Sequence, residues 1–542
     1  MFSSMQGVRR GAAAAAISSG LAVLVGHAHE PAARQPAHDA DAPRQTATGF
    51  VFRDDNGNRL RDPQEPGLPG VKVSNGRTIV ATDEAGRYAL PVGDDAIVFV
   101  IKPRGYATPL DEHCLPQFYY IHKPAGSPPQ KYPGVQPTGP LPASIDFPLA
   151  PQEEPEKFRA LMFGDTQPRN KREVEYMAHD VIEQIVAEQG HGASLGVTLG
   201  DIVFDDLSVF EPHNQAIALI GIPWYNVIGN HDLNQDAPND ALADETYESH
   251  YGPSYYAFDY GPVHFLVLDD VMWHAEAEGE GGYVGGLGAA QMEFIRNDLR
   301  LIPENQLVVL MMHIPLVQVE DRQELYRLIE QRPYALSISA HTHFLRHHFI
   351  DAADGWRGPQ PHHHVVNVTV CGSWWRGAPD ELGIPHATMS DGGPNGYAIF
   401  TFDGSQYDIE FRAARRGADY QMNIHMPGEI RPADAIATAV VVNVFNGSRD
   451  TAVRMRVLPD GPWRPLERVE GVDPHYAALK LRERGPQPPA GISLPEPAVT
   501  DHLWRGFLPA MLPVGTHLIE VEATDRDGAV HVDRESIRVV AP

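Results

Sequence analysis

The sequence has little cysteine, little positive charge and no long hydrophobic run. Only two of its 542 residues are cysteines, which excludes a zinc module built from cysteines and a scaffold held by many disulfides. No apolar run approaches the roughly 20 residues that span a bilayer, so we expect no transmembrane segment. Lys and Arg total 43 against 71 Asp and Glu, a net charge of −28. Such an acidic surface repels phosphate polymers, so no nucleic-acid polymer is expected as a partner.

The N-terminal segment predicts an exported protein. Arg9 and Arg10 precede a stretch of small and apolar residues that ends in a small-x-small cleavage site at residues 26–28. This pattern predicts a signal peptide over residues 1–28 and a periplasmic or secreted location, with the Sec and twin-arginine routes both open. Residues 29–47 are rich in Ala, Pro and His, and we expect a disordered leader there.

Three folded regions are predicted after the leader. Short β-type runs between Gly, Asn, Asp and Pro turns indicate a small β-sandwich over residues 48–150, including a proline-rich excursion at 104–142. Residues 156–420 alternate buried strand runs with helical patterns, which is typical of α/β architecture. Strands return over residues 431–542, where we expect a second sandwich. The predicted fold is therefore an α/β domain flanked by two small β-sandwich domains.

Metal-binding side chains follow five strand runs of the central region directly. The carboxyl ends of strands form the ligand crevice of open α/β sheets, so we expect these side chains to converge. One such ending is usually a turn or a helix cap, but five in one region are hard to explain as independent caps. The predicted ligands are Asp165, Gln167, Asp201, Asn230, His313, His341 and His343.

The composition of this set predicts a two-metal hydrolytic centre. Carboxylate, amide and imidazole ligands suit two divalent or trivalent ions of Mn, Fe or Zn. Asp201 has two oxygens and can bridge both ions, which would clamp a phosphoryl group and activate a hydroxide for attack on phosphorus. His231 is the candidate general acid for the departing oxygen, and either Asp232 or Asp205 could keep its ring charged and oriented.

These motifs, in this order, resemble the signature of the calcineurin-like metallophosphoesterases. The matching elements are Asp165-x-Gln167, Gly200-Asp201, Gly229-Asn230-His231-Asp232, His313 and Ala340-His341-x-His343. The resemblance covers residues 158–345 and implies a four-layer α/β/β/α core. It also implies that one metal is held by Asp165, Gln167, Asp201 and His343, and the other by Asp201, Asn230, His313 and His341. The three-region layout is similar to exported bacterial members with β-domains on both sides.

Three positions depart from the pattern of the family. The first motif usually reads Asp-x-His, and the neutral amide of Gln167 is a weaker ligand, which leaves the metal identity open. The last motif commonly starts with Gly, where this chain has Ala340. In the Ser/Thr phosphatases a carboxylate lies three residues after the bridging Asp, and here that position is Phe204.

Weaker patterns lie outside the ligand set. Trp374, Trp375 and Arg376 could bind a sugar or base and a phosphate, with packing as the alternative for the two tryptophans. Residues 362–364 are three histidines, for which we expect a solvated loop. Cys114 and Cys371 could pair in an oxidising compartment.

A candidate calcium loop lies in the first β-region. Five oxygen-bearing side chains match the ligand spacing of calcium loops, although Arg59 stands where such loops carry Gly. The segment resembles SdrD-type B repeats, and a calcium site and a plain turn cluster are equally open. The five residues are Asp54, Asn56, Asn58, Asp62 and Glu65.

We therefore expect an exported metal-dependent phosphoester hydrolase that acts on a small phosphorylated substrate. An alternative enzyme is a phosphodiesterase for cyclic nucleotides or nucleotide-sugars. An alternative from another class is a non-catalytic surface binding protein with a relict phosphatase core. The flanking sandwiches would shape or cover the crevice, or attach the enzyme to a cell surface.

Overall fold

The computed structural model describes residues 45–275 and 282–541. The predicted signal peptide and most of the predicted leader lie outside the described residues. The last three residues of that leader were assigned wrongly: strand β1 (Gln45–Arg53) begins there, and Ala47 pairs with Leu90 of β4 (Arg87–Val92). The folded N-terminal region therefore starts before the predicted boundary at residue 48.

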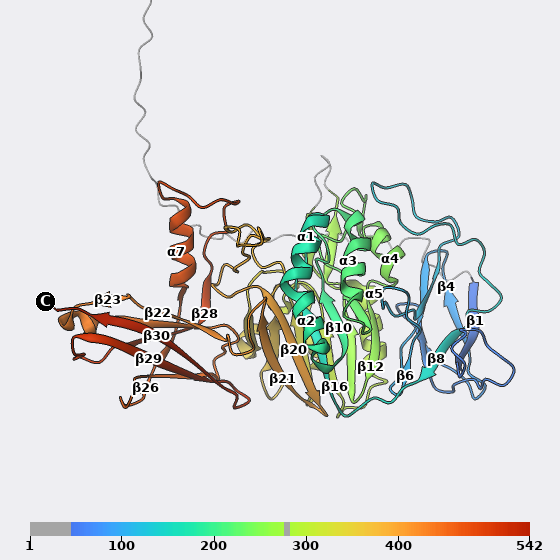
Figure 1. Cartoon of the computed structure of the whole chain (residues 1–542). Helices are drawn as coiled ribbons and strands as arrows, with labels where there is room; N and C mark the ends of the chain where they lie inside the picture. Colours follow the sequence, from blue (N-terminus) through green and yellow to red (C-terminus); the bar gives the residue numbers. More distant parts are fainter. Residues whose placement is uncertain (1–44, 276–281, 542) are drawn as a thin grey trace, which may run out of the picture. The chain divides into compact units, whose positions relative to one another are not determined.

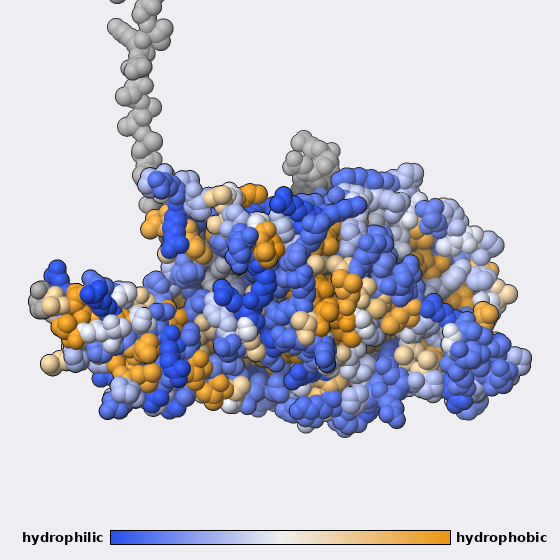
Figure 2. Space-filling model, viewed as in Figure 1, coloured by the Kyte–Doolittle hydropathy of each residue, from blue (hydrophilic) through white to orange (hydrophobic). Residues whose placement is uncertain are grey.

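The face of the molecule shown in Figure 2 is predominantly polar. Hydrophilic residues dominate the face shown in Figure 2, in keeping with 71 acidic residues in the sequence. No helix in the described part of the chain combines the length and apolar character needed to span a bilayer.

Two four-stranded sheets form the N-terminal sandwich. Buried Val51, Leu90 and Val98 belong to its core. One sheet has the order β4-β1-β8-β6, with β8 at Phe147–Pro151 and β6 at Tyr106–Ala107. The other has the order β3 (Ile79–Ala81), β2 (Lys72–Ser74), β5 (Ala96–Val100) and β7 (Tyr119–His122). Apart from β7, residues 108–146 form no regular strand, as expected for the proline-rich excursion.

The central region has the four-layer α/β/β/α core. Its strands are buried on both faces, so they read as continuous hydrophobic runs. In the first sheet, Ala160 and Met162 face the second sheet, whereas Leu161 and Phe163 pack against helices. The first sheet has the order β11 (Trp224–Val227), β10 (Ala193–Leu199), β9 (Lys157–Phe163), β20 (Gly396–Asp403) and β21 (Gln406–Ala413). The second has the order β12 (Tyr256–Tyr260), β13 (Val263–Val267), β16 (Leu307–Met311), β17 (Ala335–Ser339), β19 (His362–Val366) and β18 (Arg346–Ile350).

Helices cover the outer faces of the two sheets. An apolar stripe that includes Val174, Val181 and Ile185 packs on the first sheet. Asn170 starts this helical stretch by accepting hydrogen bonds from two backbone amides. In Figure 1, α1 and α2 follow one another in one helical stretch, and α3 lies beside it. Their bounds are α1 (Lys171–Met177), α2 (Glu183–Ala187) and α3 (Phe210–Ala218), with a π-helical turn at Ala178–Ile182. The remaining helices of this region are α4 (Glu245–Tyr251), α5 (Gly288–Leu299) and α6 (Arg322–Ile329).

The histidines at 362–364 form part of strand β19, so the prediction of a solvated loop is wrong. β19 pairs with β17 on one side and β18 on the other, and all three histidines are buried. Their polar atoms find partners inside the protein: Ser337 Oγ lies 2.8 Å from both His362 Nε2 and His364 Nδ1. Hydrogen bonding therefore permits a strand that a simple hydrophobicity pattern does not reveal.

A second sandwich with one inserted helix forms the C-terminal region. Val442, Trp504 and Ile519 belong to its core. One sheet has the order β22 (Met422–His425), β24 (Ala439–Val444), β28 (Val499–Phe507) and β27 (Glu467–Val472). The other has the order β23 (Glu429–Ile430), β30 (Val530–Val539), β29 (Gly515–Thr524), β25 (Ala452–Val457) and β26 (Arg464–Pro465). Helix α7 (Pro474–Glu483) lies between β27 and β28 in sequence and begins at the capping residue Asp473.

Candidate metal centre

The predicted ligands come together at the carboxyl ends of parallel strands. β9, β10 and β11 run parallel in the first sheet, and β16 and β17 run parallel in the second, so their ends meet at one edge of the core. Two glycines allow the close approach of the loops that follow. A Cβ at Gly200 would lie 2.4 Å from His313 Nδ1, and one at Gly229 would lie 2.0 Å from the backbone nitrogen of Asp201.

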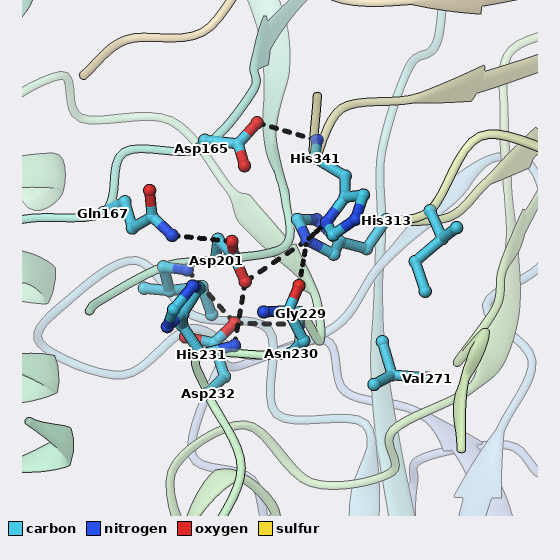
Figure 3. A network of polar contacts seen from close by, with 12 residues as sticks. Asp165, Gln167, Asp201, Gly229, Asn230, His231, Asp232, Val271, His313 and His341 are labelled. Atoms are coloured by element: carbon cyan, nitrogen blue, oxygen red, sulfur yellow. Dashed lines mark hydrogen bonds and ion pairs between the residues drawn. The ribbon is translucent and has the colours of Figure 1, made fainter. Parts of the chain in front are cut away.

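Asp201 belongs to two groups of side chains that could each hold a metal ion. Within each group, one ligand atom per residue lies within 4.8 Å of the others. Asp201 therefore occupies the position that a bridging carboxylate requires, between the two groups (Figure 3). The groups are Asp201, His313 and His341, and Asp165, Asp201 and His343.

The first group gathers four electron-pair donors around one point. His313 donates from Nδ1 to the carbonyl oxygen of Leu199 at 2.9 Å, which directs Nε2 toward the other members of the group. This nitrogen lies 3.2 Å from Asp201 Oδ1, 3.1 Å from Asn230 Oδ1 and 3.1 Å from His341 Nδ1. Asn230 thus joins the group through its amide oxygen, as predicted.

The buried charges of this site favour a positive charge at its centre. Asp165, Asp201 and His313 are almost completely buried. Burial opposes the protonation of His313, but the carboxylates of Asp201 and Asp165 outweigh it and raise the pKa of His313 to about 10. Burial also raises the pKa of Asp165. A cation would relieve the same excess of negative charge, so the donor set fits a metal site.

The second group contains a buried oxygen without a hydrogen-bond partner. Asp165 Oδ2 accepts from the backbone amide of His341 at 2.9 Å, whereas Oδ1 has no hydrogen-bond partner and lies 3.5 Å from His343 Nε2. His343 donates from Nδ1 to the carbonyl oxygen of Gly372 at 2.7 Å, and this fixes the tautomer that leaves Nε2 free. An unpartnered buried carboxylate oxygen beside a free imidazole nitrogen suits a cation.

Backbone strain is concentrated in the predicted ligands. Five of them take positive φ values, which non-glycine residues rarely adopt. Strain of this kind clusters at functional sites, where the surrounding structure enforces it. The values are 32° at Asp165, 40° at Gln167, 50° at Asp201, 69° at His341 and 56° at His343.

Gln167 does not present its oxygen to the metal site, in contrast to the prediction. Its Nε2 donates to Asp201 Oδ2 at 2.7 Å, while Oε1 accepts from the indole nitrogen of Trp374 at 2.5 Å. The amide therefore orients the bridging carboxylate instead of coordinating an ion. No local sequence pattern indicates this geometry, because the partner of Gln167 lies 207 residues further along the chain.

His231 lies beside the two groups and is oriented by Asp205. Its Nδ1 lies 2.6 Å from Asp205 Oδ1, and the ring of Phe204 stacks on it at 4.3 Å between centroids. Burial lowers the pKa of His231, but Asp201 and Asp205 outweigh this effect and raise the pKa to about 8. The structure thus selects Asp205 from the two predicted partners.

Asp232 binds backbone amides instead of the ring of His231, so the orienting role falls to Asp205, while the charge of Asp232 helps to raise the pKa of His231. Asp232 is fully buried, and its oxygens accept from the backbone amides of Ile202, Val203 and Gly229 at 2.9–3.1 Å. These bonds join the loops after β10 and β11. The carboxylate is therefore committed to backbone amides.

The Trp374–Arg376 segment divides into three different environments. Trp374 is half-buried and lines the pocket that contains Asp201 and His231, which we call the catalytic pocket; its ring centroid lies 4.1 Å from that of His343. Trp375 is buried and donates to Asp180 Oδ2 at 2.8 Å, so it is a packing residue and the prediction that it binds substrate is wrong. Arg376 lines a neighbouring cavity.

Other residues of the pocket were not predicted. The pocket has a volume of about 290 Å³ and includes Tyr283, Ser390 and Pro495 among its lining residues. Tyr283 belongs to β15 (Gly282–Gly285), which pairs with β14 (Val271–His274). Pro495 comes from the segment between α7 and β28. No local pattern marks either residue, because their place depends on tertiary packing.

Ala340 stands where the last motif of the family commonly has Gly, and the structure accommodates its side chain. Ala340 is buried, and Gly164 makes room for its methyl group, since a Cβ at 164 would lie 3.1 Å from Ala340 Cβ.

Cys114 and Cys371 are both free thiols, so they do not form the pair considered from the sequence. Burial raises the pKa of Cys371, which disfavours a thiolate ligand.

The candidate calcium loop satisfies its own polar groups. The buried carboxylates of Asp54 and Glu65 each accept from backbone amides of the loop at 2.8–3.0 Å. The side-chain amides of Asn56 and Asn58 both donate to Asp62 Oδ2, at 2.7 and 3.0 Å. The five residues do lie together, and the calcium site stays a prediction.

Comparison with known proteins places these side chains in a family. Three family models match the chain. The model of the calcineurin-like phosphoesterase itself matches residues 158–345. The model of the N-terminal part of these phosphoesterases matches residues 54–132, and the model of their C-terminal part matches residues 364–531. Among curated proteins no match was found.

Similar solved structures include two phosphatases. A dimetal phosphatase from Danio rerio shares 12% identity at a TM-score of 0.33, over 47% of this chain and 96% of its own. A purple acid phosphatase from seeds of yellow lupin, Lupinus luteus, shares 14% identity at a TM-score of 0.34, over 64% of this chain and 67% of its own. The three family matches together take in most of the chain and contain every candidate ligand, and the chain therefore belongs to the calcineurin-like phosphoesterase family.

Proposed function

We propose that the protein is an exported phosphoester hydrolase that uses a pair of metal ions and His231 as the general acid. The observation that carries this proposal is the position of Asp201, which two groups of ligand atoms share. Export is supported by the signal-peptide pattern of residues 1–28 alone. Mn, Fe and Zn all suit the donor set.

The side chains have distinct tasks in this proposal. Two cations held by the groups would lower the pKa of water and neutralise charge on the phosphoryl oxygens. Asp201 would join the two halves of the site, and Gln167 would hold its Oδ2 in place. His313 and His343 each donate their Nδ1 proton to a carbonyl oxygen, so that Nε2 of each points to the site. This outer hydrogen bonding fixes the direction of each ligand.

His231 would protonate the departing oxygen. Because Asp205 engages Nδ1, the proton to be transferred is the one on Nε2. The raised pKa keeps the ring protonated near neutral pH. His231 lines the pocket together with Asp201, which places acid and bridging carboxylate in one cavity. General acid catalysis of this kind contributes typically 10²–10⁴-fold.

One observation supports a diesterase over a monoesterase. None of the described residues that line the catalytic pocket is Lys or Arg. A phosphomonoester carries nearly two negative charges at neutral pH, whereas a diester carries one. A pocket whose positive charge comes only from bound cations and the single ring of His231 therefore suits a diester better.

Assays on purified mature protein test the proposal. The protein is loaded with Mn, Fe or Zn and offered 4-nitrophenyl phosphate and bis(4-nitrophenyl) phosphate. We expect turnover of the diester that is lost with a chelator and in Asp201→Asn. The absence of turnover with every metal would favour the non-catalytic binding protein. For export, we expect to find the mature chain outside the cytoplasm and cleaved near residue 28.

A further inference from the structure

A second cavity, larger than the catalytic pocket, lies beside it. It has a volume of about 430 Å³ and is formed by residues 376–378, helix α7, residues 488–494 and Glu496. The two walls touch closely, because a Cβ at Gly491 would lie 2.6 Å from the carbonyl oxygen of Gly377. We call this cavity the α7 groove.

The α7 groove is positively charged in a strongly acidic chain. Four of its lining residues are Lys or Arg and two are Glu. Lys480 Nζ lies 3.1 Å from Glu483 and 3.5 Å from Glu496, and Arg484 lies 3.0 Å from Glu496. The two glutamates are therefore already paired by these cations.

Two arginines of the groove are left without an acidic partner. Within the described part of the chain, neither Arg376 nor Arg482 forms a salt bridge. Arg376 Nε is buried and has no hydrogen-bond partner, and the guanidinium lies 5.0 Å from the ring centroid of Trp374. His386 adds no charge near neutral pH, because burial lowers its pKa. Both arginines are thus available to an anionic ligand.

The groove and the catalytic pocket share their walls. Trp374 lines the pocket, and Arg376, two residues later, lines the groove. On the other side Pro495 lines the pocket while its neighbours Leu494 and Glu496 line the groove. The α7 groove therefore adjoins the catalytic pocket along Trp374 and Pro495.

We propose that the α7 groove binds a second phosphate group of the substrate, and this inference rests on the proposed function of the neighbouring site. Guanidinium groups bind phosphate through paired hydrogen bonds, and Arg376 and Arg482 are the unpartnered guanidinium groups of the groove. The substrate class is a phosphodiester with a further phosphate near the scissile one. Because the chain as a whole is acidic, such a local cationic groove also directs a polyanionic substrate to this edge.

A matched pair of chromogenic diesters tests the groove. The first is the 4-nitrophenyl ester of thymidine 5′-phosphate, and the second is the same ester with an added 3′-phosphate. Metal-loaded wild-type protein is expected to hydrolyse the second with a kcat/KM at least tenfold higher, through a lower KM. Equal kcat/KM values for the two esters would overturn the proposal.

Two substitutions and one control locate the effect. Arg482→Ala and Arg376→Gln should each reduce the tenfold preference to less than threefold, while the ester without the added phosphate changes less than twofold. Arg505→Ala removes the same charge from an exposed position of β28 outside the groove, and it should keep the preference. Equal losses on both esters, or the same loss in Arg505→Ala, would contradict a phosphate site. Arg482 is exposed, so its variant is expected to fold.

A binding measurement separates this proposal from the proposed catalytic function. Metal-free protein is titrated with thymidine 3′,5′-bisphosphate and thymidine 5′-monophosphate in a calorimeter. We expect the bisphosphate to bind at least tenfold more tightly, and Arg482→Ala to remove the difference. If the protein fails to turn over substrate but this difference in affinity persists, only the proposed hydrolase function is rejected. Equal affinities would reject the groove even if the enzyme turns over.

Discussion

At the scale of single residues, the two oxygens of Asp201 face different neighbours. Oδ1 lies 3.2 Å from His313 Nε2 and accepts from the backbone amide of His231 at 2.9 Å. Oδ2 accepts from Gln167 Nε2. The carboxylate is therefore held from both sides before any ion arrives. Preorganisation of this kind reduces the cost of assembling a charged site.

Substituting His231 distinguishes a general acid from a merely structural histidine. An alkyl ester needs a proton on its departing oxygen, whereas nitrophenolate leaves without one. We expect His231→Ala to lower kcat about 10²–10⁴-fold on an alkyl ester and far less on a 4-nitrophenyl ester. Steady-state kinetics on the two esters measure this difference. Equal losses on both would count against the acid role.

Substituting Asp205 should change the pH dependence of the same step. Asp205 and Asp201 together raise the pKa of His231 to about 8, against burial. Activity on alkyl esters needs the protonated ring, so it falls as pH rises through this pKa. Asp205→Asn removes one of the carboxylates, and the basic limb of the kcat profile should move to lower pH. An unchanged limb on alkyl esters would exclude Asp205 as the partner of His231.

At the scale of secondary-structure elements, the motifs at the strand ends predicted most of the candidate metal centre. Parallel strands end at one edge, so a sequence that places Asp, Asn and His after five strands predicts where they meet. The direction of a side chain depends on distant partners and could not be predicted. Gln167 is turned by Trp374, Asp232 is engaged by three amides, and Trp375 is buried against Asp180.

Strand β19 was predicted less well for a related reason. Three consecutive histidines suggest solvent when considered alone, and only the pairing of β19 with β17 and β18 buries them. Asp205 was a candidate because it is near Asp201 in sequence, but the stacking of Phe204 on His231 was not foreseen. The α7 groove joins residues about 100 positions apart, which no local pattern reveals.

The buried histidines around β19 predict that stability falls in mild acid. Burial lowers the pKa of His362 and of His347 to about 4, so both are neutral in the folded protein. Below pH 6.5 the unfolded chain takes up protons that the folded chain does not. Lowering the pH from 7 to 5 should therefore reduce the free energy of unfolding by about 2 kcal/mol for each histidine.

Urea unfolding of chelator-treated protein at the two pH values checks this expectation. The variant His347→Gln/His362→Gln lacks both groups, so its stability should depend less steeply on pH. Chelation removes the competing effect of pH on metal binding. If the variant and the wild-type protein lose stability to the same extent, other groups cause the acid sensitivity.

At the scale of the whole molecule, the excursion of the N-terminal region is tied to the catalytic region by buried charge. Lys123 forms an ion pair with Glu245 of α4 and another with Asp95 at 3.1 Å. The side chain of Glu245 is fully buried. The same excursion reaches the loop of Asp205, the partner of the proposed acid, because the hydroxyl of Tyr132 donates to Asp206 at 3.1 Å. The N-terminal region therefore supports the site from outside.

Removing one partner of this buried pair should destabilise the protein. Lys123→Met leaves the carboxylate of Glu245 buried without its cation, and we expect a loss of about 3–5 kcal/mol in the free energy of unfolding. Denaturant titration measures the loss. The double variant Lys123→Met/Glu245→Gln removes both charges and should recover part of it. A loss below 1 kcal/mol in the single variant would show that the pair is solvated.

The number of metal ions per chain tests the central claim most directly. Elemental analysis of saturated, desalted wild-type protein should find two bound Mn, Fe or Zn ions per chain. Asp201→Asn should retain fewer than one, because both groups share this carboxylate. Gln167→Ala should keep two, since its oxygen faces Trp374 instead of the ligand groups. Wild-type protein that binds one ion or none at saturation, or an Asp201→Asn variant that still binds two, would contradict the account.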